Sequence, residues 1–192
     1  MLPATDGLFG EVNELARDTP WLHGPAAAFA NFGIVLFALL LLAGWWFARG
    51  QSASTMAAAL TAPLSTLVAV AANQPIISHV AEARPYAAHP HVLLLVGASA
   101  DPSFPSDHAT MAGAVAAGLW LVSWRLGVVT SALALLMAAT RVYVGAHYPQ
   151  DVVAGLALGA VVAVVVWLIL RNPMTRLVES LRQTRFAGVL QA

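Results

Sequence analysis

The feature that most constrains this chain is the stretch from residue 26 to residue 48, which holds no charged side chain. About 20 consecutive apolar residues let an α-helix cross the roughly 30 Å hydrocarbon core of a bilayer, and this stretch is long enough. The rest of the chain has the same character, since 59% of its 192 residues are hydrophobic and only 9% are charged. Soluble domains average about 25% charged residues, so the sequence predicts an all-α integral membrane protein.

Four further apolar segments are long enough to be membrane-spanning helices: residues 52–72, 107–124, 126–144 and 152–170. Pro63 lies in the second span and is expected to kink it. The apolar piece 91–96 is too short to cross, and it is predicted to lie in a long loop or to form a short re-entrant or interfacial helix. We therefore expect a bundle of about five transmembrane helices, with six as the alternative, in a single membrane domain covering residues 1–192.

The arginines predict which way this bundle faces. An odd number of spans puts the two chain ends on opposite sides of the membrane, and six of the nine basic residues then share the side of the C-terminus. Because cytoplasmic loops carry an excess of Lys and Arg, that side is predicted to be cytoplasmic and the N-terminus to lie outside. The six are Arg49, Arg125, Arg171, Arg176, Arg182 and Arg185.

Both ends of the chain are predicted to lie at the membrane surface, on either side of a helical core at residues 26–170. In the segment 1–24, Leu8, Val12 and Leu15 recur at helical spacing, which indicates a short interfacial helix on the outer side. Residues 171–192 form an arginine-rich cytoplasmic tail that either holds anionic headgroups or is a solvated helix. Within the last span, Gly155 and Gly159 form a GxxxG pattern, which predicts close packing against another helix.

Six polar residues stand out because they interrupt or border the apolar spans. On the five-span topology, three separate segments bring them to the same outer membrane face: the end of the second span, the start of the third, and the connection between the fourth and fifth. Ionisable groups near a bilayer core are costly and usually functional. The six residues are Arg84, Ser106, His108, Arg141, His147 and Asp151.

This set of side chains suits a tetrahedral oxyanion. The guanidinium groups of Arg84 and Arg141 can pair bidentately with phosphate oxygens. Pro105 suits an early helical position, which would leave backbone N–H groups near Ser106 free to bind an anion. The segment "FPSDH" is therefore predicted to form part of a phosphate-binding site.

Two histidines supply reactive groups to the same site. Pro149 favours a helix start, which places Asp151 in the first turn, four residues after His147. The carboxylate can then hydrogen-bond one ring nitrogen and leave the other free to attack phosphorus. His108, from another helix, can protonate the leaving oxygen and later activate water.

Three short blocks that contain these residues resemble the signature of the phosphatidic acid phosphatase type 2 superfamily, which includes lipid phosphate phosphatases. The family pattern is Lys-x6-Arg-Pro, then Pro-Ser-x-His, then Ser-Arg-x5-His-x3-Asp. The second block is intact at residues 105–108, and the third covers residues 140–151 with threonine in place of serine. The first block keeps Arg84 and Pro85, but Ile77 occupies the position of the family lysine, and the chain contains no lysine.

The resemblance implies a metal-independent hydrolase, with no cofactor, that works through a phosphohistidine on His147. It also implies that His108 is the acid and base and that Asp151 orients His147. The remaining three residues would hold the phosphate: Arg84, Ser106 and Arg141. The missing lysine puts affinity or substrate range in question, and the side chains considered as partial substitutes are Gln74, His79, His89 and His91.

Small bacterial members of the family resemble undecaprenyl-diphosphate phosphatases, which recycle the polyprenyl carrier of cell-wall synthesis. The resemblance therefore implies undecaprenyl or decaprenyl diphosphate as the substrate, a location in the bacterial inner membrane and a site facing the periplasm. The expected partners are the lipid substrate and the bilayer, and no nucleic acid. Alternative substrates are phosphatidylglycerophosphate, phosphatidic acid and a polyprenyl-phosphosugar phosphate.

Other interpretations of the same residues explain less of the pattern. The main rival is a non-catalytic lipid-binding or transport protein on the same scaffold, which the missing lysine favours. A serine-hydrolase triad of Ser106, His147 and Asp151 would lack a Gly-x-Ser-x-Gly turn and leave both arginines unexplained. A metal at His89 and His91 would have no carboxylate nearby in the sequence.

Overall fold

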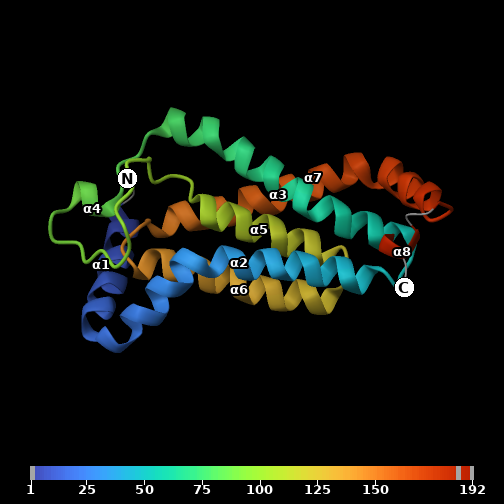
Figure 1. Ribbon diagram of the computed structural model, residues 1–192. Coiled ribbons are helices and arrows are strands. Elements are labelled where there is room, and N and C mark those ends of the chain that lie inside the picture. The colour runs from blue at the N-terminus through green and yellow to red at the C-terminus, as the bar shows by residue number, and fades with distance from the viewer. Residues whose placement is uncertain (1–2, 185–186, 191–192) are drawn as a thin grey trace.

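The computed structural model describes residues 3–184 and 187–190, and all the regular secondary structure in these residues is helical. Short helices α1 and α4 lie at one end of an elongated bundle and α8 lies at the other (Figure 1). The predicted all-α bundle is therefore confirmed. Its long helices are α2 (His23–Ala48), α3 (Ala53–Val80), α5 (Asp107–Trp120), α6 (Trp124–Tyr143) and α7 (Pro149–Leu181). The short ones are α1 (Pro3–Asp18), the 3₁₀ helix η1 (Pro20–Leu22), α4 (Pro85–Ala88) and α8 (Ala187–Leu190).

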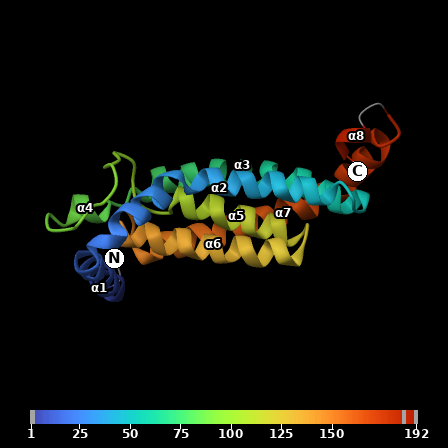
Figure 2. The same ribbon diagram turned by 60° about the horizontal axis from the view of Figure 1, so that its bottom comes forward.

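Helix α5 runs through the middle of the bundle in both side views (Figures 1 and 2) and packs against α2, α3, α6 and α7. It has 14 residues, a length of about 21 Å at 1.5 Å per residue, so the predicted span 107–124 was too long. Because neighbouring helices surround it, α5 does not need the length of a helix that faces lipid. By length and composition, four helical segments of the described chain can each cross a membrane. Helix α5 is not one of these four, but it packs between the helices that form them.

Two other helices are longer than the sequence predicted. Helix α3 continues beyond residue 72 to Val80, with Pro63 and Pro75 inside it. Helix α7 continues beyond residue 170 to Leu181, with Pro173 inside it. Val178 is fully buried in the apolar cluster that also contains Met56. The predicted arginine-rich tail therefore begins inside α7, its contact with headgroups on the cytoplasmic side stays a prediction, and Arg185 lies outside the described residues.

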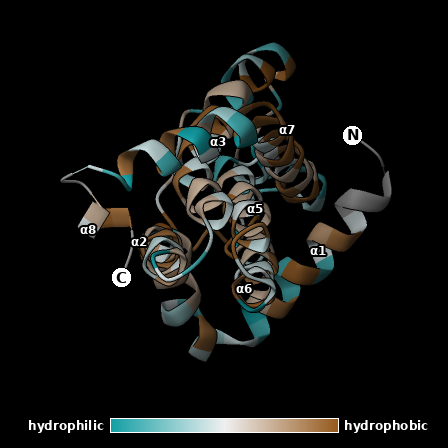
Figure 3. Ribbon diagram, turned by 90° about the vertical axis from the view of Figure 1, so that its right-hand side faces the viewer, coloured by the Kyte–Doolittle hydropathy of each residue, from teal (hydrophilic) through white to brown (hydrophobic). Residues whose placement is uncertain are grey.

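The outside of the bundle is apolar. Phe32, Trp46 and Ile169 are 70%, 66% and 67% exposed. Figure 3 shows hydrophobic residues along the helices seen from the α8 end, most evenly on α7. A surface of this kind is stable when hydrocarbon covers it, so the protein is a multi-pass membrane protein.

Close contact between α5 and α7 fixes the end of the bundle that carries the polar residues. A Cβ atom on Gly159 would lie 2.0 Å from the carbonyl oxygen of Thr110, and one on Gly155 would lie 2.7 Å from that of Ser106. The predicted packing role of the GxxxG pattern is therefore confirmed. At the start of both helices, the Ser106 N–H donates a hydrogen bond of 3.1 Å to the carbonyl of Asp151.

The segment from residue 89 to residue 106 crosses this end of the bundle as a loop, which resolves the two predictions for residues 91–96 in favour of a loop. Helix α1 holds it, because the side chain of Asn13 donates to the Leu93 carbonyl at 2.9 Å and accepts from the Leu93 N–H at 3.0 Å. The loop in turn contacts the α6–α7 connection, where Leu95 N–H donates to Val144 O at 3.0 Å. Gly145 there has φ +77°, and a Cβ on it would meet the Leu93 carbonyl.

Candidate active site

A polar cavity of about 280 Å³ lies at the α1–α4 end of the bundle, enclosed by α3, α4, α5, the 89–106 loop and the α6–α7 connection. Four of the six predicted site residues line it, and they come from three separate segments of the chain. These are Arg84, His108, Arg141 and His147. Asp151 and Ser106 are both fully buried beside it.

His147 has different hydrogen-bond partners on its two ring nitrogens. Nδ1 lies 2.9 Å from the carbonyl oxygen of Ser103 and 3.3 Å from Oδ2 of Asp151. Nε2 lies 3.2 Å from Nη1 of Arg84. A carbonyl only accepts and a guanidinium only donates, so the proton belongs on Nδ1 and the lone pair on Nε2. The ring is therefore neutral, with its unprotonated nitrogen beside a cationic wall of the cavity.

The surroundings of His147 favour this neutral form. Burial lowers the pKa of His147 below its usual value of 6.5, and the charges of Arg141 and Arg84 lower it further, whereas Asp151 opposes the shift. The ring therefore stays unprotonated, and able to act as a nucleophile, at pH values where an exposed histidine would be charged.

Asp151 lies in the first turn of α7, which begins at Pro149 as the sequence predicted. Its Oδ2 accepts hydrogen bonds from the Tyr148 N–H at 2.9 Å and from the Ser103 hydroxyl. These two donors hold the carboxylate next to the ring of His147. The other carboxylate oxygen, Oδ1, is buried and has no hydrogen-bond partner among the described residues.

The two arginines of the cavity are held from different directions. Arg84 precedes α4, and its Nε donates to the Asp101 carbonyl at 2.7 Å. Arg141 lies in the last turn of α6 and is only 7% exposed, yet its Nε has no partner among the described residues. Its Nη1 is 3.5 Å from the Ala30 carbonyl, which is at the limit for a hydrogen bond. Both guanidinium groups thus line the cavity with donor capacity available for an anion.

The start of α5 differs in detail from the prediction. Pro105 lies before the helix and Ser106 is its N-cap residue, so Pro105 does not occupy an early helical position. The Ser106 hydroxyl is buried and makes no hydrogen bond to the described residues, and Ser106 is not part of the cavity wall. Asp107 and His108, in the first turn, do line the cavity. The phosphate-binding role predicted for the Ser106 side chain therefore stays a prediction.

Helix α3 contributes the wall where the family pattern has its lysine. Ile77 lines the cavity, so this position does face the site. Of the side chains considered as substitutes for the lysine, Gln74 lines the cavity, and the three histidines do not. The amide groups of Asn73 and Gln74 donate to Oδ1 of Asp107 at 2.8 and 3.0 Å, which fixes the first turn of α5 against α3.

Sequence reasoning missed Ser103 and Asn73, both fully buried at the site. Ser103 contacts Asp151 across 48 positions of the chain and Asn73 contacts Asp107 across 34, so no local spacing pattern could indicate either pair. Within the described ranges, no three His, Asp or Glu side chains are grouped so that they could hold a metal ion.

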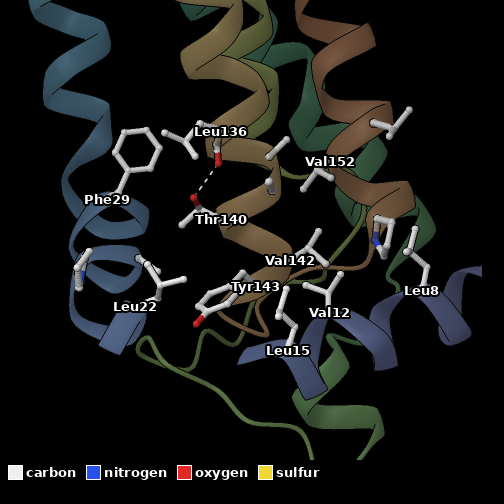
Figure 4. Close-up of a pocket in the computed structure, with 16 residues that line it drawn as sticks. Leu8, Val12, Leu15, Leu22, Phe29, Leu136, Thr140, Val142, Tyr143 and Val152 are labelled. Carbon is white, nitrogen blue, oxygen red and sulfur yellow. Dashed lines mark hydrogen bonds between the residues drawn. The ribbon is translucent and has the colours of Figure 1, made fainter. Parts of the chain in front are cut away.

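A second hollow lies on the other side of α6 and α7. This apolar groove, about 710 Å³ in volume, is formed by α1, η1, α2, α6 and α7 (Figure 4). Leu8, Val12 and Leu15, the predicted interfacial stripe, lie on its α1 wall. Thr140, which replaces the family serine, also lines the groove and uses its hydroxyl to bond the Leu136 carbonyl at 2.7 Å.

Comparison with known proteins identifies the class. The family model described as the PAP2 superfamily matches residues 58–174, which is more than half of the chain and includes all six predicted site residues. The chain therefore belongs to the PAP2 superfamily, the phosphatidic acid phosphatase type 2 family that its motifs resemble. It is a hydrolase, a membrane phosphatase acting on lipid phosphates.

Individual relatives extend the likeness over most of the chain. The undecaprenyl-diphosphatase BcrC of Bacillus subtilis strain 168 is 32% identical over 155 residues, which is 81% of this chain and 78% of BcrC. YbjG of Escherichia coli strain K12, an undecaprenyl-diphosphatase candidate, is 28% identical over 94% of this chain and 91% of its own length. The crystal structure of Aquifex aeolicus LpxE has the same fold, with a TM-score of 0.64, 24% identity and coverage of 84% of this chain and 93% of LpxE.

Proposed function

We propose that this phosphatase removes the terminal phosphate from undecaprenyl or decaprenyl diphosphate through a phosphohistidine formed on Nε2 of His147. The observation that carries the proposal is the pair of hydrogen bonds to the His147 ring, with a carbonyl at Nδ1 and a guanidinium at Nε2. This arrangement supports an unprotonated Nε2 beside the group that would bind phosphate, and a nucleophile needs both.

In the proposed first step, Arg84 and Arg141 bind the oxygens of the terminal phosphoryl group in the cavity. Nε2 of His147 attacks its phosphorus, and the bond from phosphorus to the bridging oxygen breaks. His108 donates a proton to that oxygen, so that the lipid monophosphate leaves. The two guanidiniums stabilise the charge that develops on the transferring phosphoryl group.

In the second step, neutral His108 takes a proton from water, and the water oxygen attacks the phosphohistidine. The bond between phosphorus and Nε2 breaks, inorganic phosphate is released and His147 regains its lone pair. Asp151 and the Ser103 carbonyl keep the Nδ1 proton in place throughout. These proposed steps use side chains and backbone groups of this chain and water, and the proposal includes no metal.

The choice of substrate and of membrane side rests on other observations. The likeness to BcrC over most of both chains supports a polyprenyl diphosphate. The cavity lies at the α1–α4 end, whereas Arg49, Arg125 and Arg171 belong to the other ends of α2 and α6 and to the later part of α7. By the positive-inside rule, this supports a cavity on the periplasmic side of the bacterial inner membrane.

The proposal is tested by phosphate release from the purified protein in detergent with EDTA. The substrates are undecaprenyl diphosphate, phosphatidylglycerophosphate, phosphatidic acid and a polyprenyl-phosphosugar phosphate, with wild type and His147→Ala compared on each. We expect turnover without added metal, fastest with the diphosphate and abolished by the substitution. Faster hydrolysis of another lipid would reassign the substrate, and activity retained in His147→Ala would overturn the mechanism. A correctly folded protein that hydrolyses none of the four would favour the non-catalytic alternative.

A further inference from the structure

Ser103 carries a buried hydroxyl between the reactive histidine and its carboxylate, and none of the three sequence blocks includes it. We propose that Ser103 is a positioning residue that sets the direction and basicity of the His147 ring through Asp151. The inference rests on the proposed phosphohistidine chemistry and adds to it a residue from a separate part of the chain.

Ser103 forms hydrogen bonds with both His147 and Asp151. Its carbonyl oxygen accepts the Nδ1 proton of His147 at 2.9 Å, and its hydroxyl donates to Oδ2 of Asp151. Its own N–H donates to the Glu82 carbonyl at 2.8 Å, which fixes the residue against the segment between α3 and α4. Ser103 therefore fixes the positions of His147 and Asp151 relative to each other.

The distances show that the carboxylate is shared. Oδ2 of Asp151 lies 3.3 Å from Nδ1 of His147, farther than the Ser103 carbonyl oxygen. The same Oδ2 accepts the Ser103 hydroxyl and the Tyr148 N–H. Two donors other than the histidine thus neutralise part of the carboxylate charge, which weakens its attraction for the Nδ1 proton.

The position of Ser103 separates this role from phosphate binding. Ser103 is fully buried outside the cavity wall and, unlike that of Ser106, its hydroxyl is already bonded to Oδ2 of Asp151, so it is not available to a ligand in the cavity. An effect of Ser103 on turnover has to pass through His147 or Asp151. It should change kcat and leave KM nearly unchanged.

Removal of the hydroxyl has a defined expected result. In Ser103→Ala, Asp151 loses one donor and interacts more strongly with the ring, which stabilises the imidazolium form. The acid limb of the kcat profile should then shift to higher pH, and kcat should fall by about 10-fold to 100-fold, the range for a lost hydrogen bond to a charged group. Arg84 and Arg141, whose charges also lower the pKa of His147, are unchanged in this variant. The other titratable groups of the cavity wall are unchanged as well: Asp101, Asp107 and His108.

A double-mutant cycle tests the proposal directly. Wild type, Ser103→Ala, Asp151→Asn and the double variant are assayed with undecaprenyl diphosphate for kcat, KM and pH dependence. If Ser103 acts through Asp151, adding Ser103→Ala to Asp151→Asn changes kcat by less than about twofold. Ser65→Ala is the matched control, because its hydroxyl is also buried but, among the described residues, bonds only the Ala62 carbonyl within α3, at 2.9 Å.

The outcomes separate this inference from the proposed function. Additive losses in the double variant, an unshifted pH profile or a change confined to KM would overturn the role of Ser103. Ser103→Thr keeps a hydroxyl, so recovery of the acid limb in that variant would support positioning over a structural effect. If His147→Ala is inactive while Ser103→Ala matches wild type, only the present inference fails. If His147→Ala remains active, the proposed function fails first.

Discussion

Two hollows flank α6 and α7 at the same end of the bundle, and they differ in almost every physical property. The cavity of about 280 Å³ is lined by arginine, histidine and aspartate side chains, whereas the groove of about 710 Å³ is lined almost entirely by hydrocarbon. Neighbouring residues face opposite ways, since Arg141 lines the cavity and Thr140 the groove. The two faces of α6 therefore line different hollows, and the sequence motif alone does not show which of its residues line the polar cavity.

The difference also shows how a polar site is maintained within a membrane protein. The cavity is closed by hydrogen bonds from the 89–106 loop and by the glycine contacts of α5 with α7. The groove needs no such bonds, because lipid hydrocarbon can cover apolar side chains without loss of hydrogen bonding. Changes on the cavity side should therefore affect catalysis, and changes on the groove side should have much smaller effects.

The largest contrast is expected between Arg141 and its neighbour. Arg141→Ala removes a guanidinium from the cavity and should lower kcat/KM by about 100-fold to 1,000-fold, as loss of a preorganised donor at a transition state does. Thr140→Ala removes a hydroxyl bonded within α6 and should leave kcat/KM within about threefold of wild type. Steady-state phosphate release measures both, and equal losses in the two variants would show that the faces are not separate.

A smaller effect is expected at the contact that closes the cavity end. Gly159→Ala places a Cβ 2.0 Å from the Thr110 carbonyl oxygen, so α5 and α7 have to move apart at a cost of about 1–3 kcal/mol. Gly24→Ala is the matched control, because a Cβ there meets no atom within 4 Å. Unfolding in a mild detergent should occur earlier for Gly159→Ala only. Unchanged stability of that variant would contradict the close helix contact.

The smallest effect is expected where the family lysine is missing. Ile77→Lys adds a cation to the cavity wall, and at about 4 Å from a phosphate oxygen it contributes roughly 1 kcal/mol, or about a fivefold lower KM. Ser78→Lys adds the same charge at an exposed neighbour that is not part of the cavity wall, and KM should stay the same. The fall in KM should lessen at high salt if part of the attraction is screened. Equal KM values for both variants would argue that phosphate does not bind near position 77.

The sequence predicted the helices correctly where the length of an apolar segment determines the bounds of a helix. Residues 26–48 gave nearly the bounds of α2, and Pro149 marked the first residue of α7. Helix α5 was predicted too long, because the apolar residues Leu121 and Val122 form a turn in the structure and their hydropathy does not distinguish a turn from a helix. Helix α7 was predicted too short, because a charged residue at 171 and a proline at 173 are typical of a helix end. The sequence does not show that the later part of α7 is buried in one apolar cluster with Met56 and Leu190.

The site was predictable as far as the motifs reached. Alternating spans bring the ends of three segments to one face, so the convergence of Arg84, His108 and His147 follows from topology alone. The contacts that support these residues could not be predicted, because Ser103 and Asn73 bond to residues far away in the sequence. The sequence also did not show that the Ser106 hydroxyl is buried beside the cavity wall, since burial there depends on how α5 meets α7.

The most direct test of the account is to trap the covalent intermediate. Wild type and His147→Ala are mixed with undecaprenyl diphosphate labelled in its terminal phosphate, quenched in alkali within one turnover and analysed by peptide mass spectrometry. We predict an acid-labile, alkali-stable phosphoryl group on His147 in the wild type and none in the variant. Phosphate release by the wild type with no labelled protein at any quench time, or label on another residue, would contradict a phosphohistidine at this position.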